Sequence, residues 1–128
     1  MIHGLIIDTS GREGVVVLVC DGIPSQTFTL PEGRALLKNL FATLSSLASL
    51  NKLKFNYIGV GQGPGTFTGT RVGAMTAQAL AFGWDIPLIP FSSTLLPNID
   101  EIALLTHTSF LQGKTSQQIE LVYISPTA

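Results

Sequence analysis

The residues with the clearest capacity for chemistry lie in a glycine-rich run between positions 61 and 73. Its first part, which we call the glycine loop, contains Gly61, Gly63, Pro64, Gly65, Thr66, Phe67 and Thr68. Glycine lets a backbone adopt left-handed angles and come very close to another group. A strand, a glycine loop and a helix in this order also direct backbone N–H groups at whatever lies before the helix. The pattern therefore fits either a bound phosphate or the backbone of another protein segment.

Phosphate binding is the weaker interpretation of the glycine loop. A Walker A loop continues from its last glycine into Lys and then Ser or Thr, whereas this chain continues as Gly69-Thr70-Arg71. A dinucleotide fingerprint follows the first strand of a βαβ unit, but here the glycines follow the fourth predicted strand. We therefore interpret the loop as a tight turn that lets another backbone approach closely.

Asp8 is the one acidic side chain placed where it could serve a reaction, because it closes the first predicted strand. Its carboxylate could hold Mg²⁺ through water or orient an attacking group, or it could cap the turn that follows. Capping is favoured because no second acid lies at a matching strand end. His3 and His107 lack metal-ligand spacing, and no serine lies in a GxSxG motif. We expect neither a metal site nor a hydrolase nucleophile.

The elements that position these residues form a chain order of β-β-β-α-β-α-β, typical of an α/β domain with five strands. The predicted strands are 5–8, 15–20, 26–30, 57–60 and 86–91, and the predicted helices are 32–50 and 68–82. Asp21-Gly22 predicts a hairpin turn, so the first three strands should be antiparallel. Gly83 is predicted to cap the second helix, and the prolines of the fifth strand suggest an exposed edge or a crossover. Two more short strands are predicted at 102–105 and 119–124.

The second helix is apolar nearly all round, since Arg71 is its only charged residue between positions 66 and 83. Gly69, Gly73, Ala77 and Ala81, which we call the small-residue stripe, recur every four residues and would let another helix approach. That helix is either 32–50 of this chain or a helix of a partner protein. The predicted partner interface consists of Gly69, Arg71, Val72, Gly73, Met75, Thr76, Ala77 and Leu80 on this helix and Leu37, Phe41 and Leu44 on the preceding one.

Composition supports a protein partner and argues against nucleic acid. Charged residues make up 12% of the 128 residues, the net charge is −1, and the mean hydropathy is +0.42. No basic field is available to grip phosphates, while much apolar surface must be exposed. No apolar run reaches the length of a membrane span, and the single cysteine allows no internal disulfide. We expect a cytoplasmic protein.

Three segments together resemble the TsaB family of the ASKHA (actin, sugar kinase, Hsp70) superfamily. They are Leu5-Ile6-Ile7-Asp8-Thr9-Ser10, the run from Gly61 to Gly73, and Ala77-Gln78-Ala79-Leu80-Ala81-Phe82-Gly83. The resemblance covers about residues 2–97 and implies an ASKHA N-terminal lobe with a mixed five-stranded sheet. The chain departs from the family where the first helix opens, because 30–35 reads Leu-Pro-Glu-Gly-Arg-Ala in place of a His-Ser-acid segment.

The resemblance implies a non-catalytic role in forming threonylcarbamoyl-adenosine on tRNA. TsaB-like proteins hold TsaD, the transferase, in a competent state through two N-lobe helices, and a TsaE-like ATPase joins that complex. The family also uses these helices to form homodimers. Asp8 would then be a vestigial ASKHA acid, and no cofactor or direct nucleic-acid contact is expected. The alternatives are a nucleotide-dependent kinase-like or phosphatase-like half-domain and a homodimeric interaction protein.

The predicted domain organisation is an N-lobe at 1–97 followed by a short remnant of a second lobe, or a tail, at 98–128. Family members have a second lobe about as large as the first, whereas only some thirty residues follow position 97 here. A nucleotide clamp needs both lobes, so we expect no ATP binding within this chain.

Overall fold

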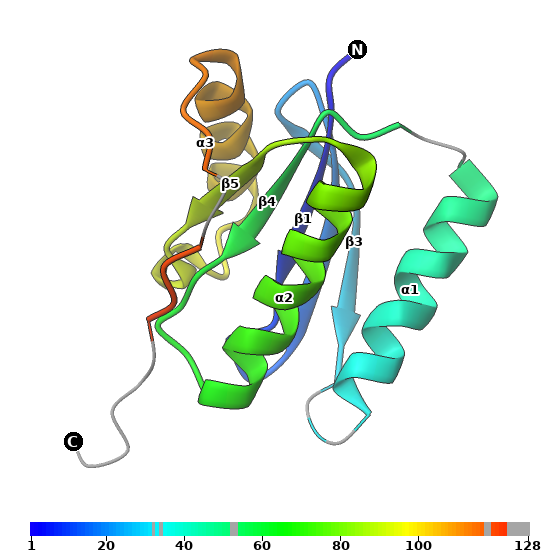
Figure 1. Ribbon diagram of the computed structural model, residues 1–128, viewed down its shortest axis with the longest axis vertical. Coiled ribbons are helices and arrows are strands. Elements are labelled where there is room, and N and C mark those ends of the chain that lie inside the picture. Colours follow the sequence, from blue (N-terminus) through cyan, green and yellow to red (C-terminus); the bar gives the residue numbers. More distant parts are fainter. Residues whose placement is uncertain (32, 34, 52–53, 117–118, 123–128) are drawn as a thin grey trace.

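A mixed five-stranded sheet forms the centre of the computed structural model, which describes residues 1–31, 33, 35–51, 54–116 and 119–122 (Figure 1). The strands are β1 (His3–Asp8), β2 (Gly14–Cys20), β3 (Ile23–Leu30), β4 (Tyr57–Gly61) and β5 (Leu88–Phe91). They lie in the order β3-β2-β1-β4-β5, with β1, β2 and β3 antiparallel and β1, β4 and β5 parallel. Asp21 and Gly22 have φ values of 50° and 82°, as the predicted hairpin requires. The predicted α/β class and chain order are confirmed.

Alternating side chains of the central strands fill two hydrophobic layers, one on each side of the sheet. Leu5 and Ile7 of β1 belong to the layer beneath two helices, α1 (Leu36–Asn51) and α2 (Phe67–Trp84). Ile6 belongs to the opposite layer, beneath a third helix, α3 (Ile99–Leu111). Figure 1 shows α2 in front of the sheet with α1 beside it. The two-residue period of a strand produces this division.

Both helices of the first layer differ from the predicted bounds for local backbone reasons. α1 begins at Leu36 and not near position 32, because Gly33 has a φ of 116°, outside the helical range. α2 continues through Gly83, so the predicted cap is wrong. Asp85 caps this helix with a left-handed φ of 55°, and the N–H of Ile86 donates to the carbonyl of Ala81. This is the six-to-one hydrogen bond of a Schellman motif.

The helix α3 corrects the prediction of a strand at 102–105. Asn98 accepts a hydrogen bond from the Glu101 N–H at 3.2 Å and donates to the Glu101 carboxylate at 3.1 Å. Asn98 is therefore the N-cap of α3, and its amide also holds the Glu101 side chain, so a helix begins where an apolar run alone resembles a strand. Of the other predicted strand, residues 119–122 form none, and 123–124 lie outside the described residues.

The region after position 97 contributes to packing against the sheet. Ile102 and Ala103 of α3 are buried with Ile6 and Val17. The predicted division into 1–97 and 98–128 stays a prediction. None of the described helices is both long and apolar enough to span a membrane.

A buried phenol at the start of β4 makes the fold sensitive to alkaline pH. Burial raises the pKa of Tyr57 above its ordinary 10.0, and a hydrogen bond with Thr106 offsets part of that rise. The unfolded chain therefore loses this proton first as the pH rises. The stability that the neutral phenol contributes is complete below pH 10.0 and is lost as the pH rises through the folded-state pKa.

Tyr57→Phe is expected to flatten part of the alkaline decline in the free energy of unfolding. The ring would keep its place, since it is stacked on Phe110 with centroids 5.2 Å apart. Urea unfolding of both proteins between about pH 9 and pH 11 measures the effect. An equally steep decline in the variant would contradict a buried, neutral Tyr57.

Candidate partner-binding surface

Asp8 lies buried at the end of β1, where it caps the turn toward β2. Its Oδ1 accepts hydrogen bonds from the Ser10 N–H at 2.8 Å and the Ser10 hydroxyl at 2.6 Å. Its Oδ2 is buried and has no hydrogen-bond partner among the described residues. Of the two interpretations of Asp8, this geometry favours capping of the turn. Among the described residues, no three His, Cys, Asp or Glu side chains lie close enough to hold a metal ion.

The glycine loop uses its backbone groups within the chain. The N–H of Gly63 donates to the Ser93 hydroxyl at 3.0 Å, and the Thr66 N–H donates to the Ser10 carbonyl at 3.2 Å. The Gly69 N–H donates to the Thr66 side chain at 3.1 Å, which makes Thr66 the N-cap of α2. These donors are engaged inside the protein and do not form an open phosphate cradle.

The close approach that the glycines allow is made by this chain's own backbone. A Cβ at Gly61 would overlap the Asp8 carboxylate, and one at Gly65 would overlap the main chain of Ser10. A Cβ at Gly63, whose φ is 97°, would overlap the Val122 carbonyl. This corrects the prediction that the loop admits the backbone of a partner.

The small-residue stripe also faces inward. Gly69, Gly73 and Ala77 are buried, and a Cβ at Gly73 would lie 2.5 Å from the Thr9 Oγ1. The hydroxyl of Thr9 donates to the Gly69 carbonyl. The stripe therefore seats α2 on β1, and these three residues do not reach a partner. Gly and Ala fit either a sheet or a second helix, so their spacing could not distinguish the two.

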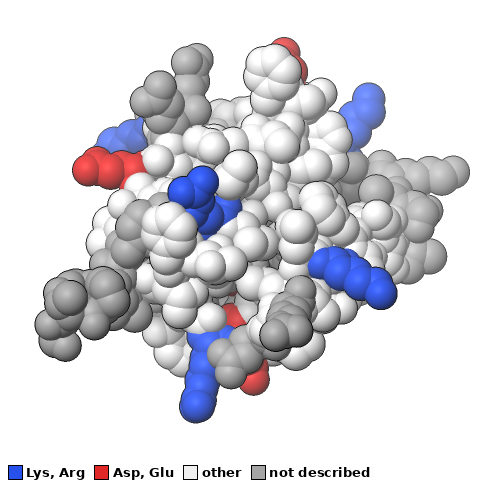
Figure 2. Space-filling view, turned by 60° about the horizontal axis from the view of Figure 1, so that its bottom comes forward, with Lys and Arg blue, Asp and Glu red and all other residues white. Residues whose placement is uncertain are grey.

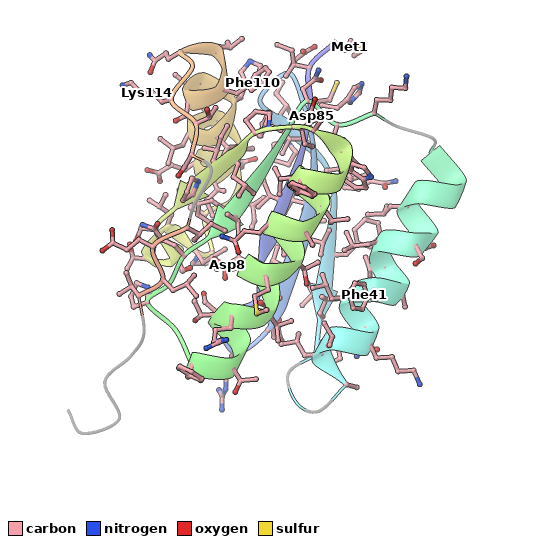
Figure 3. All side chains as sticks on the ribbon, in the orientation of Figure 1. Met1, Asp8, Phe41, Asp85, Phe110 and Lys114 are labelled. Atoms are coloured by element: carbon pink, nitrogen blue, oxygen red, sulfur yellow. The ribbon has the colours of Figure 1, made fainter. Side chains whose placement is uncertain are left out.

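An apolar groove lies between α1 and α2 on the outer side of this layer. The α1–α2 groove has a volume of about 450 Å³ and is lined by Leu37, Phe41, Phe67, Thr68, Arg71, Val72, Met75, Thr76, Ala79 and Leu80. Large side chains in it are unusually exposed: Leu37 by 46%, Phe41 by 52%, Met75 by 58% and Phe67 by 59%. Figure 3 shows Phe41 projecting from α1 toward α2.

Charge is nearly absent from this surface. Within the described part of the chain, Arg71 is the only charged residue that lines the groove, and its guanidinium lies 5.1 Å from the centroid of the Phe67 ring. This cation–π contact holds the guanidinium at the rim, beside the apolar floor. Figure 2 shows only scattered charges over the face that includes the start of α2. A surface of this kind suits an apolar partner with a carboxylate near Arg71.

The structure brings together most of the predicted interface residues and separates the others. Leu37, Phe41, Arg71, Val72, Met75, Thr76 and Leu80 line the groove. Leu44 is partly buried against the core. Phe67 and Thr68, predicted only as loop residues, line it too, and Ala79 was missed. The four-residue spacing of Phe67, Arg71, Met75 and Ala79 is the signal that could have found them.

Comparison with known proteins places the chain in a family. The sequence profile of the family described as "TsaD: tRNA N6-adenosine threonylcarbamoyltransferase" matches residues 33–96, half of the 128-residue chain. The tRNA threonylcarbamoyladenosine biosynthesis protein TsaB of Haemophilus influenzae is 37% identical over 92 residues, and that of Escherichia coli K12 is 31% identical over 93 residues. The chain belongs to the TsaB family. The profile match runs from α1 to β5 and thus includes both helices of the groove.

The chain spans about two fifths of the length of these TsaB relatives. The alignments cover 70% and 71% of this chain but 39% and 40% of the relatives. Among solved structures, YeaZ from Pseudomonas aeruginosa matches with a TM-score of 0.61 at 28% identity, over 72% of this chain and 44% of that chain. T. thermophilus RuvC in complex with a Holliday junction substrate matches with a TM-score of 0.55 at 8% identity, over 88% and 80% of the two chains. At that identity, RuvC shows a shared fold alone.

Proposed function

We propose that the chain is a non-catalytic subunit in the formation of threonylcarbamoyl-adenosine on tRNA and binds a TsaD-type transferase through the α1–α2 groove. The observation that supports this most strongly is the groove itself, where four large apolar side chains remain half-exposed. Water-exposed apolar surface gathered in one concave place is typical of a protein interface. The curated TsaB relatives name the pathway in which such a partner would act.

The groove is shaped to receive a helix. Its walls are two helices of this chain, and its lining residues recur at helical spacing on both. A partner helix that places apolar side chains three and four residues apart would fill it. Arg71 at the rim would form a bidentate hydrogen-bonded pair with an acidic side chain of that partner.

A non-catalytic role agrees with the chemistry of the buried groups. Asp8 is engaged with Ser10, and the glycine-loop N–H groups named above are engaged within the chain. The transferase would therefore supply the reacting groups, and a TsaE-type ATPase would join the complex in the cytoplasm, where tRNA is modified. In the absence of the transferase, a second copy of this chain would occupy the same groove.

Co-expression of this chain with a TsaD-type transferase and a TsaE-type ATPase tests the proposal. We expect the transferase to co-purify with the chain, and tRNA carrying threonylcarbamoyl-adenosine to form only when both are present. Failure of the folded chain to bind the transferase would contradict the proposal. The kinase-like alternative would instead give heat on titration with ATP and Mg²⁺, whereas we expect none.

A further inference from the structure

β3 leaves one edge of the sheet open, and the register shows which backbone groups face outward. The N–H of Asp21 donates to the Ile2 carbonyl. Because hydrogen-bonded pairs alternate along an antiparallel ladder, every second residue of β2 counted back from Asp21, namely Val19, Val17 and Val15, bonds to β1. Val16 and Leu18 must then bond toward β3, where they face Phe28 and Gln26. The N–H and C=O groups of the alternate residues Thr27 and Thr29 therefore point away from the sheet.

The opposite edge of the sheet is closed. β5 contains Pro90, which has no N–H, and Ser116 donates its N–H to the Leu88 carbonyl at 2.9 Å. Further along, the N–H of Val122 donates to the Gln62 carbonyl at 2.8 Å. No comparable hydrogen bond reaches the outer side of β3 from any described residue.

The stretch of β3 from Gln26 to Leu30 also lacks the devices that usually prevent edge-to-edge pairing. None of the residues 22–31 is charged, and the only proline inside the strand, Pro24, lies near its start. Gln26, Thr27 and Thr29 are exposed on the two faces of the strand. Edge strands in soluble proteins normally carry a charge, a bulge or a cover at such places. The register between β2 and β3 shifts once, between Leu18 and Val19 of β2. These two residues face Gln26 and Pro24, so the bulge lies outside the stretch from Gln26 to Leu30.

We propose that the free edge of β3 pairs antiparallel with β3 of a second copy of this chain, centred on Phe28. Thr27 and Thr29 each offer one donor and one acceptor, so the edge is complementary to itself when reversed. Thr27 of one protomer would face Thr29 of its partner in two hydrogen-bonded pairs, giving four backbone hydrogen bonds. The two Phe28 rings would meet on the side of α1 and α2, and Thr–Thr pairs would form on the other side.

This pairing is distinct from the α1–α2 groove. The described residues that line the groove all belong to α1 and α2, and none of them lies on β3. An isologous contact about a two-fold axis closes after two copies, because each protomer offers one free edge. Because the paired edge is short, it buries less surface area than a standard protein interface. The dimer should therefore be weak and concentration-dependent.

Amide hydrogen exchange of the whole chain measured at increasing protein concentration tests the proposal. We expect exchange at the Thr27 and Thr29 N–H groups to slow at least about tenfold at concentrations where the dimer dominates. Phe41→Glu, which alters the groove, should leave this effect intact. Exchange at both amides that is independent of concentration would overturn the proposal, as would protection that appears only with the transferase present.

Substitution of the edge threonines by charged residues gives a second, independent test of the pairing. Thr27→Lys with Thr29→Lys should abolish self-pairing, because lysines would then face each other across the two strands. Thr27→Glu with Thr29→Glu should do the same for the same reason. Phe41→Glu is added to both variants to remove self-association through the groove. An equimolar mixture of the two should then restore a dimer in sedimentation analysis, whereas a mixture that remains monomeric would overturn the proposal.

Discussion

Phe41→Glu combined with Met75→Glu is expected to abolish binding to the transferase while leaving the chain folded. Both side chains line the α1–α2 groove from opposite helices, and both are more than half exposed in the free chain. A carboxylate at either place would be buried without a partner in the complex. Loss of two central contacts of this kind should raise Kd at least about 1,000-fold, or roughly 4 kcal/mol.

A matched control lies on the same helix. Phe82 is 91% exposed on α2 and does not line the groove, so Phe82→Glu should leave binding unchanged. The free energy of unfolding of both variants should stay within about 0.5 kcal/mol of the parent value, since each altered side chain is already exposed. Binding by the double variant with unchanged affinity, or loss of binding by Phe82→Glu alone, would contradict the assignment.

Gly61→Ala and Gly65→Ala are expected to cause large losses of stability. An added methyl at position 61 would overlap a buried carboxylate that Ser10 holds through two hydrogen bonds. At position 65 it would overlap the main chain of Ser10, which cannot rotate away. Each variant should lose about 3 kcal/mol, which corresponds to a fall in Tm of roughly 10 °C.

Gly83→Ala is the control for this effect. Gly83 lies inside α2 with no atom within 4 Å of a Cβ placed there. Alanine should raise stability by up to about 1 kcal/mol, because it is the better helix former. Differential scanning calorimetry of the three variants measures these shifts. Equal Tm values for Gly61→Ala and Gly83→Ala would show that the loop is not closely packed against Asp8.

The sheet and its two outer helices could be predicted because their patterns are unambiguous. The β-branched run of β2, the Asp21-Gly22 turn and the leucine spacing of α1 each favour one structure. The helix α3 could not be recognised from its short apolar run alone. Asn98 carried the missing information, as an N-cap residue just after Pro97 that binds both the N–H and the carboxylate of Glu101.

The candidate site was predicted in part, and the wrong placement of its glycines and alanines has a physical reason. Large apolar side chains such as Phe41 and Met75 gain free energy when they leave water, so predicting that they lie together on one surface was informative. Glycine and alanine do not indicate which surface they contact, because they fit against a sheet as well as against a helix. The sequence therefore did not indicate that Gly69 and Gly73 pack on Thr9.

Photocrosslinking tests most directly whether the α1–α2 groove holds the transferase. A photoreactive phenylalanine analogue in place of Phe41 would report contact in the groove, and the same analogue in place of Phe82 would report the exposed side of α2. We expect a covalent adduct with the transferase from position 41 and none from position 82. An adduct from position 82 alone, or a stable complex without any adduct from position 41, would contradict binding of the transferase in the groove.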